Sequence, residues 1–316
     1  MSCFAGIDFG GMSVKVGLFD GQARLLCKHT AATSRAAATP NPLKTRGRGG
    51  RAGGARPQAP PPARRGGGVG TPGVIDGAKG VVVRWSNYGW EDRPFAADLA
   101  AGLGVPVELA NDANAAALGE ARFGAGKKYN SSILLTLGTG IGSGIILDGE
   151  IFGGFGGGGG EAGHMVIESG GIPCPCGRRG CFEQYASATA LVRDTKRAMF
   201  EHKNSALWRI AGSPEGADGR TAFLAAREGD AAARKVVDSF IRYLADGIAN
   251  LVNLFRPEAV LLGGGISNEG EALLAPLRQR VGERLYVDAA RIPFALTRAA
   301  LGNDAGMYGA YALVCG

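Results

Sequence analysis

AGIDFGGMSVKVGLFDG, residues 5 to 21, reads as two short apolar strands on either side of a turn at Gly10 and Gly11. SILLTLGTGIGSGIILDGE, residues 132 to 150, has the same construction. An offset of 128 positions places Gly10 on Gly138, and most apolar positions of the two stretches then agree. A repeat of this kind predicts two similar lobes, each of which opens with a glycine-turn hairpin.

Helical and strand patterns alternate along the rest of the chain. The expected helices cover residues 94–103, 111–123, 182–200, 232–255 and 305–314, and the expected buried strands cover 105–109 and 258–262. The pattern at 232–255 carries one apolar stripe and ends before Pro257. Strands that alternate with helices predict an α/β fold whose ligands gather where strands end in glycine turns.

Length and composition narrow the class of protein. A chain of 316 residues can form one large or two modest domains. It contains no apolar run near the roughly 20 residues of a membrane helix, and its first residues do not resemble a signal sequence. We therefore expect a cytoplasmic protein that has no membrane partner, in which clustered cysteines are metal ligands and not disulfides.

The positive charge of the chain is concentrated in one segment. The net charge is +7, but residues 21 to 75 hold ten Lys or Arg and no acid, so the remainder carries about −3. Residues 31–70 show no helical or strand period. Regular structure is expected to begin again at Val69, with a strand and a turn. A basic nucleic-acid-binding insert is one explanation of this anomalous segment. The explanation we favour is a coding region read out of frame, which would leave the segment poorly ordered.

A cluster of soft ligands lies in EAGHMVIESGGIPCPCGRRGCFE, residues 161 to 183. One imidazole and three thiols within eighteen positions match the donors of a tetrahedral zinc site: His164, Cys174, Cys176 and Cys181. The alternative is that the three cysteines are buried small apolar residues and that the histidine is satisfied by hydrogen bonds. Four protein ligands leave no open position for a water, so the predicted zinc is structural. It would hold Glu161 and Glu183, the acids at either end of the stretch.

Three glycine turns follow buried strands, at Gly10, at Gly138 and at Gly263. Glycine lets backbone N–H groups approach phosphate oxygens, although a single turn of this kind is often only a tight turn. Three of them indicate a nucleotide site, and no P-loop motif is present. Asp112 follows a buried strand and begins a helix, where it could accept a hydroxyl proton or simply cap the helix. Asp8 could bind Mg²⁺ through water or satisfy turn amides.

Six stretches taken together resemble the ROK family of sugar kinases and repressors. They are GIDFGGMSVKVGLFD, NDANAAALGE, LGTGIGSGIILDGEIF, GEAGHMVIE, CPCGRRGCFEQYAS and AVLLGGGIS, and the likeness is greatest to the bacterial glucokinases of the family. The resemblance implies a two-lobed actin-like ATPase fold, with nucleotide and sugar in the cleft between the lobes. It also implies a small lobe over residues 1–110 and a large lobe over 111–300, with 301–316 returning to the small lobe.

The resemblance also implies roles for single residues. Asp112 would be the general base of an ATP-dependent hexose kinase. The expected sugar ligands are Asn111, Asp112, Glu161, His164, Glu183, Gly73 and Asn87. The expected nucleotide and Mg²⁺ ligands are Asp8, Gly10, Gly11, Ser13, Lys15, Gly138, Thr139, Gly140, Gly263, Gly264 and Gly265. Met12 stands where many members have threonine, so Ser13 would supply the hydroxyl.

The expected reaction is the phosphorylation of glucose by Mg²⁺–ATP, and N-acetylmannosamine or another hexose is the alternative substrate. A sugar-responsive repressor of the same family is less favoured, because only residues 1–5 precede the first strand. Many relatives of the family are dimers, so a homodimer is expected, and nucleic acid is not an expected partner. Residues 31–70 replace a strand and helix of those relatives, which puts turnover in doubt.

Overall fold

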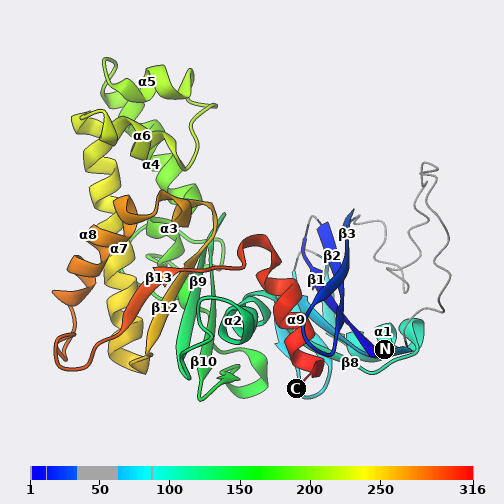
Figure 1. Ribbon diagram of the computed structural model, residues 1–316. Coiled ribbons are helices and arrows are strands. Elements are labelled where there is room, and N and C mark those ends of the chain that lie inside the picture. Colours follow the sequence, from blue (N-terminus) through cyan, green and yellow to red (C-terminus); the bar gives the residue numbers. More distant parts are fainter. Residues whose placement is uncertain (1, 12, 34–62, 87, 316) are drawn as a thin grey trace. The chain divides into compact units, whose positions relative to one another are not determined.

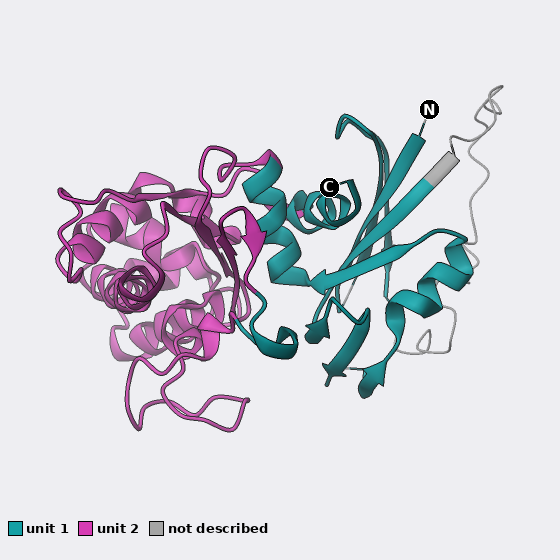
Figure 2. Cartoon of the chain, turned by 90° about the horizontal axis from the view of Figure 1, so that it is seen from below, with its two compact units in different colours: residues 1–122, 153–159, 304–316 teal, residues 123–152, 160–303 magenta. Residues whose placement is uncertain are grey.

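The computed structural model describes residues 2–11, 13–33, 63–86 and 88–315. The chain divides into two compact units. Unit 1 comprises residues 1–122, 153–159 and 304–316, and unit 2 comprises residues 123–152 and 160–303 (Figure 2). Among the described residues, none of the helices combines the length and hydrophobicity needed to cross a bilayer.

Unit 1 is built on a five-stranded sheet in the order β3-β2-β1-β4-β8. Its strands are β1 (Ser2–Phe9), β2 (Ser13–Asp20), β3 (Leu25–Ala32), β4 (Ala63–Thr71) and β8 (Val107–Asn111). The first three strands are antiparallel neighbours, whereas β4 runs parallel to both β1 and β8. The smaller elements are β5 (Val74–Asp76), β6 (Val81–Trp85), β7 (Trp90–Arg93), α1 (Phe95–Leu103), α2 (Asp112–Phe123), α9 (Ala305–Cys315) and a 3-10 turn, η2 (Phe155–Gly157).

Unit 2 repeats this arrangement with the order β11-β10-β9-β12-β13. Its strands are β9 (Ser132–Leu137), β10 (Ile141–Leu147), β11 (Glu150–Ile151), β12 (Ala259–Gly263) and β13 (Ala295–Arg298). Its helices are α3 (Glu183–Ala186), α4 (Ala188–Glu201), α5 (Ala206–Ala211), α6 (Thr221–Arg227), α7 (Ala231–Phe255) and α8 (Glu271–Gly282), and its 3-10 turns are η3 (Ala162–His164), η4 (Gly265–Glu269) and η5 (Gly302–Asp304) (Figure 1). The matching strand orders are the structural form of the repeat seen in the sequence.

The core of unit 2 forms between its sheet and α7. Leu134, Leu135 and Leu137 of β9 are almost completely buried, as expected for a central strand covered on both faces. The helix α7 begins at the N-cap Asp230, whose carboxylate accepts the N–H of Ala233, and it ends before Pro257 as the sequence predicts. The α/β class is therefore confirmed.

The strand β4 corrects the sequence prediction, because it begins at Ala63, six residues before Val69. Its glycine run, Gly66 to Gly68, lacks the apolar side chains that normally mark a central strand. The structure shows why glycine is required: a Cβ atom at Gly68 would lie 1.7 Å from the carbonyl oxygen of Ala310 in α9. Residues 31 and 32 of the anomalous segment also form part of a strand, the end of β3, and residues 34–62 lie outside the described part of the chain.

A second correction concerns the helix expected over residues 182–200. The chain forms two helices there, α3 and α4, because Ser187 takes an extended conformation between them. The Ser187 hydroxyl accepts the N–H of Ala190 and so caps α4. The strand expected at residues 105–109 is also displaced by two residues, to Val107–Asn111.

Candidate functional site

The four predicted metal ligands come together in unit 2. The ligand atoms of His164, Cys174, Cys176 and Cys181 all lie within 4.8 Å of one another. Cys176 Sγ is 3.6 Å from Cys181 Sγ, and Cys174 Sγ is 3.7 Å from His164 Nδ1. Tetrahedral zinc with sulfur ligands at about 2.3 Å spaces its donor atoms about 3.8 Å apart, so this donor set fits that geometry.

The thiols of the cluster differ in acidity. Burial is the main cause that raises the pKa of Cys174 to about 12, and burial also raises the pKa of Cys181. The backbone N–H of Arg178 is the main cause that lowers the pKa of Cys176. Buried thiols with raised pKa values are poor thiolates by themselves, whereas a bound metal cation stabilises the thiolate form. The chemistry of the cluster therefore suits a metal.

Glu183 connects this cluster to a glycine turn. Its Oε1 lies 3.1 Å from Cys174 Sγ and 3.7 Å from His164 Nδ1. Its Oε2 occupies the space beside Gly140, where a Cβ atom would lie only 2.4 Å away. The preceding residue, Phe182, is fully buried against Gly247 of α7, which fixes the start of α3. The carboxylate of Glu183 is thus held in place from two sides.

Glu161 lies at the start of η3 and is exposed. Its carbonyl oxygen accepts the N–H of His164, so the two residues are joined through the backbone. Ser143 of β10 holds the chain before η3, because its hydroxyl bonds Gly160 and Ala162. Glu161, His164 and Glu183 consequently belong to one region of unit 2.

The glycine turns of unit 2 follow the carboxyl ends of neighbouring strands. Gly138 follows β9, and Gly263 ends β12, where it pairs with Thr136. At Gly264 the backbone has φ +85°, and a Cβ atom would lie 2.3 Å from the carbonyl oxygen of Leu137. Only glycine fits there without strain. Of the expected nucleotide residues, Gly138, Thr139, Gly140, Gly263, Gly264 and Gly265 therefore lie at one edge of this sheet.

The expected phosphate and Mg²⁺ residues of unit 1 lie at the turn between β1 and β2. Asp8 Oδ2 accepts a hydrogen bond from Lys15 Nζ at 2.9 Å, and both side chains are largely buried. The N–H of Gly10 donates to the carbonyl oxygen of Ser13 and closes the turn. A Cβ atom at Gly11 would meet no atom within 4 Å. Met12 lies outside the described residues.

Asn111 and Asp112 stand where β8 passes into α2. The Asn111 side chain caps the helix, because its Oδ1 accepts the N–H groups of Ala113 and Asn114. Its Nδ2 donates to the carbonyl oxygen of Gly73 at 3.1 Å, so two expected sugar ligands are in contact. The neighbouring Asp112 is the first residue of α2, and its own Oδ1 also accepts the N–H of Ala113, at 2.9 Å. Asn87 lies outside the described residues.

Sequence reasoning missed several polar groups near these residues. Thr71 pairs with Asn111 in the sheet, and its buried hydroxyl has no protein partner in the described part of the chain. The same holds for Trp85 Nε1 and Asn114 Oδ1. In unit 2, Gln184 donates to Cys174 Sγ at 3.7 Å and to Glu183 at 3.4 Å. Thr71 ends a strand beside Asn111, which is a usable signal, but the contacts of Gln184 leave no trace in the sequence.

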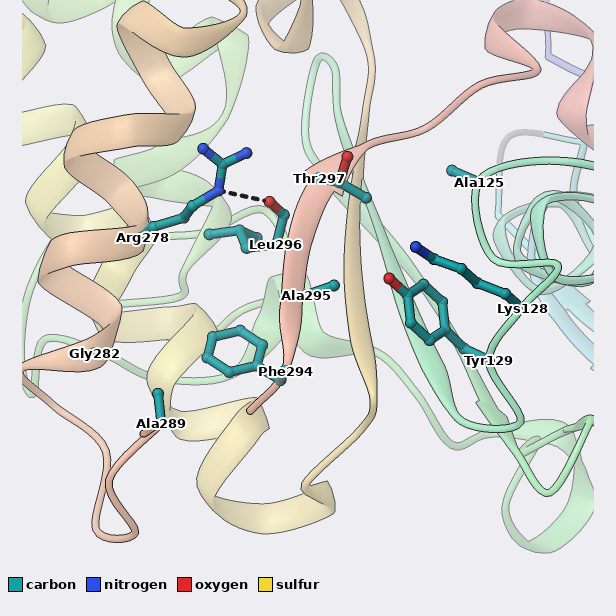
Figure 3. A pocket seen from close by; sticks show the side chains of 10 residues that line it. All are labelled: Ala125, Lys128, Tyr129, Arg278, Gly282, Ala289, Phe294, Ala295, Leu296 and Thr297. Atoms are coloured by element: carbon teal, nitrogen blue, oxygen red, sulfur yellow. Dashed lines mark hydrogen bonds between the residues drawn. The ribbon is translucent and has the colours of Figure 1, made fainter. Parts of the chain in front are cut away.

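A pocket of about 510 Å³ in unit 2 lies apart from these residues (Figure 3). It is lined by Ala125, Lys128, Tyr129, Arg278, Gly282, Ala289, Phe294, Ala295, Leu296 and Thr297. Arg278 is already engaged, because it bonds the carbonyl oxygen of Leu296 and the carboxylate of Glu271. The ammonium group of Lys128 lies over the Tyr129 ring, 5.1 Å from its centre. None of the predicted site residues lines this pocket.

Comparison with known proteins agrees with the geometry. The model of the ROK family matches residues 4–316. The chain is 41% identical over 249 residues to a glucokinase of Thermotoga maritima, which covers 78% of each protein. It is 35% identical over 318 residues to a glucokinase of Streptomyces coelicolor, which covers 98% of this chain and 96% of the relative.

A solved structure extends the likeness to three dimensions. The ROK family glucokinase from Streptomyces griseus, in complex with glucose and AMPPNP, has a TM-score of 0.80 at 35% identity and covers 98% of both chains. The expected resemblance and the expected actin-like ATPase fold are confirmed. The chain belongs to the ROK family.

Proposed function

We propose that this chain is an ATP-dependent sugar kinase that phosphorylates a hexose, with glucose at its 6-hydroxyl as the expected substrate. The observation that carries the proposal is the likeness to a glucokinase over nearly its full length. The residues proposed for this reaction lie at strand ends of the two units and at the starts of η3 and α3. N-acetylmannosamine or another hexose is the alternative substrate.

Asp112 is the proposed general base. Phosphoryl transfer to an alcohol requires a group that accepts the hydroxyl proton as the bond to phosphorus forms. Asp112 follows β8 directly as the first residue of α2, and its Oδ1 accepts the N–H of Ala113. The sugar would be bound by Asn111 and Gly73 in unit 1 and by Glu161, His164 and Glu183 in unit 2, because carboxylate, amide and imidazole groups pair well with hydroxyls.

The nucleotide phosphates would be bound by backbone N–H groups of the glycine turns at Gly10 and Gly138, and Gly263 to Gly265 would flank the adenosine. Asp8, with Lys15 beside it, would hold Mg²⁺ through water. Bound Mg²⁺ neutralises charge that develops on the transferred phosphoryl group. Preorganised amides at the turns supply further stabilisation of the same charge.

The cluster of His164 and three cysteines is a proposed structural zinc site. Four protein ligands exhaust tetrahedral coordination, so the metal would crosslink the chain and activate no water. Because Cys174 and His164 both contact Glu183, such a crosslink would fix that acid for sugar binding. Zinc would thus support the sugar site indirectly.

The test is ADP release from Mg²⁺–ATP by the purified chain, measured against glucose, mannose, N-acetylglucosamine and N-acetylmannosamine. Selective turnover of one sugar establishes the kinase and names the substrate. Zinc-loaded, folded protein that releases no ADP with any sugar would refute the proposal. A repressor would bind a sugar without releasing ADP, so calorimetric binding in the same panel separates the two functions.

The role of Asp112 needs its own variant. Asp112→Asn should lower kcat by at least about 10³-fold and leave sugar affinity within a few-fold, because the amide cannot accept the proton. Asp238→Asn, which changes an exposed acid on α7, is the matched control and should behave as wild type. Wild-type turnover by Asp112→Asn would show that another group is the base.

A further inference from the structure

The helix α9 touches the sheet and α2 of unit 1 through two glycines in its first turns. A Cβ atom at Gly306 would lie 3.0 Å from Cγ of Asp8 and 3.3 Å from each carboxylate oxygen. A Cβ atom at Gly309 would lie 1.5 Å from the carbonyl oxygen of Ala115 in α2. The two glycines therefore meet different kinds of atoms: Gly306 meets the end of one side chain, and Gly309 meets backbone.

Gly306 lies beside the carboxylate of Asp8 and near the backbone of Asp112. Asp8 pairs with Gly70 across β1 and β4. A Cβ atom at Gly70 would lie 3.6 Å from Cα of Asp112 and 3.9 Å from the carbonyl oxygen of Gly306. The Cβ position built at Gly70 is thus within 4 Å of both the Asp112 backbone and the first turn of α9.

The carboxylate of Asp8 has two close neighbours. Lys15 Nζ donates to Oδ2 at 2.9 Å, and a Cβ atom at Gly306 would lie 3.0 to 3.3 Å from Cγ and both oxygens. Only 18% of the Asp8 side chain is exposed. The position of the carboxylate is therefore determined by the ion pair together with the contact to α9.

We propose that Gly306 is a positioning residue for phosphoryl transfer, because its missing side chain lets the Asp8 carboxylate rest directly on α9. The inference depends on the proposed function, in which Asp8 holds Mg²⁺ through water. A methyl group at position 306 would displace the carboxylate by a few tenths of an ångström, since contacts of 3.0 to 3.3 Å are tighter than nine in ten real Cβ contacts. Helix and sheet could both stay in place, because the displaced atoms are the end of a side chain.

This role differs from ordinary glycine packing in what a substitution should do. Alanine is the better helix former, so Gly306→Ala should leave thermal stability unchanged or raise it. The same change should reduce catalysis, because small misplacements of a catalytic group have large effects on rate. Gly309→Ala, by contrast, should destabilise unit 1, because the new methyl group meets the backbone of α2.

The experiment is a Mg²⁺ titration of sugar phosphorylation by wild type, Gly306→Ala and Gly102→Ala. Gly102 is a matched control, since it is a helical glycine of α1 whose Cβ would meet nothing within 4 Å. We expect Gly306→Ala to lower kcat about 3- to 10-fold and to raise the Mg²⁺ concentration for half-maximal rate, with the sugar KM and melting temperature retained. Gly102→Ala should match wild type.

A double mutant tests whether the effect passes through Asp8. In an Asp8→Ala background, which should retain a low measurable rate, adding Gly306→Ala should cause no further loss. Wild-type kcat and Mg²⁺ dependence in Gly306→Ala, or an equal loss in the Asp8→Ala background, would overturn the inference alone. A wild-type chain that phosphorylates no sugar would overturn the proposed function and the inference with it.

Discussion

Gly68→Ala is the substitution that most directly tests the fold of unit 1. Gly68 lies in β4, and a Cβ atom there would approach the carbonyl oxygen of Ala310 to 1.7 Å and its carbonyl carbon to 2.6 Å. Because both atoms belong to the backbone of α9, no side-chain rotation can relieve the contact. Either α9 or β4 has to move.

The size of the effect follows from the distances. A carbon and an oxygen in ordinary contact are roughly 3.2 Å apart or more, so α9 would have to retreat by about 1.5 Å over at least one turn. Overpacking of a close-packed interface typically costs about 1–3 kcal/mol of the free energy of unfolding, and occasionally more. We expect the upper part of that range, because the helix also contacts β1 and β2.

The neighbouring residue provides the control. At Gly67 a Cβ atom would lie 3.7 Å from Val107 and 3.8 Å from Leu103, which are ordinary contacts. Gly67→Ala should therefore be neutral or stabilising by about 0.5–1 kcal/mol, as expected when alanine replaces glycine in an element interior. The two variants differ by one position in the same strand and should have opposite signs.

The assay is urea denaturation monitored by tryptophan fluorescence in a Trp208→Phe background. That change leaves Trp85 and Trp90, both in unit 1, as the reporters. Equal midpoints for Gly67→Ala and Gly68→Ala would refute the reasoning, and with it the register of β4 against α9. The result would also show whether the glycine-rich strand is built as described.

Three further predictions concern unit 2. Cys176→Ser should lower bound zinc, measured by mass spectrometry, from about one to near zero per chain, and it should weaken sugar binding while nucleotide affinity is retained. The control Cys27→Ser, at an exposed cysteine, should change neither zinc content nor sugar binding. An active Cys176→Ser protein that still binds zinc would contradict the proposed site. Gly140→Ala should raise the sugar KM about tenfold, because its methyl group would displace Glu183, and an unchanged KM would show that this acid does not bind sugar. The pKa of Asp230 is lowered: burial would raise it, but hydrogen bonds from backbone N–H groups outweigh burial. The ionised Asp230 therefore stabilises the fold fully above the unfolded pKa near about 3.9. This stabilisation is lost as the pH falls through the lower folded pKa. Asp230→Asn should therefore reduce the difference between urea midpoints at pH 7 and pH 3, and an undiminished difference would assign acid sensitivity to other groups.

The parts of the fold that the sequence predicted are those with local signals. Both hairpins combine apolar strands with a glycine turn, and α7 combines an apolar stripe with an N-cap and a terminal proline. The strand β4 lacked any such signal, because its face toward α9 is glycine. The need for glycine arises from a helix more than 230 positions further along the chain. No local pattern can report such a contact.

The candidate site divides in the same way. The ligands of the proposed metal site are close in sequence, so their spacing alone predicts that they form a cluster. The contact of Glu183 with Gly140, by contrast, depends on how α3 docks beside the strand β9, and that docking is set by Phe182 against Gly247. Such a contact arises from tertiary packing and cannot be inferred from spacing. At the start of α2 the side chains of Asn111 and Asp112 both accept the N–H of Ala113.

The last helix gives this chain an unusual order of assembly during synthesis. The helix α9 packs on β1 and β4, and the Tyr311 hydroxyl donates to the carbonyl oxygen of Asp20 near the start of the chain. A ribosome that adds 5–20 residues per second needs about 10–50 s to translate from the end of β4 to α9. Until α9 emerges, the nascent sheet of unit 1 has an uncovered glycine face, and all of unit 2 is translated before α9. A stop codon just before α9 would therefore remove the helix that covers this face of unit 1 and leave the residues of unit 2 intact.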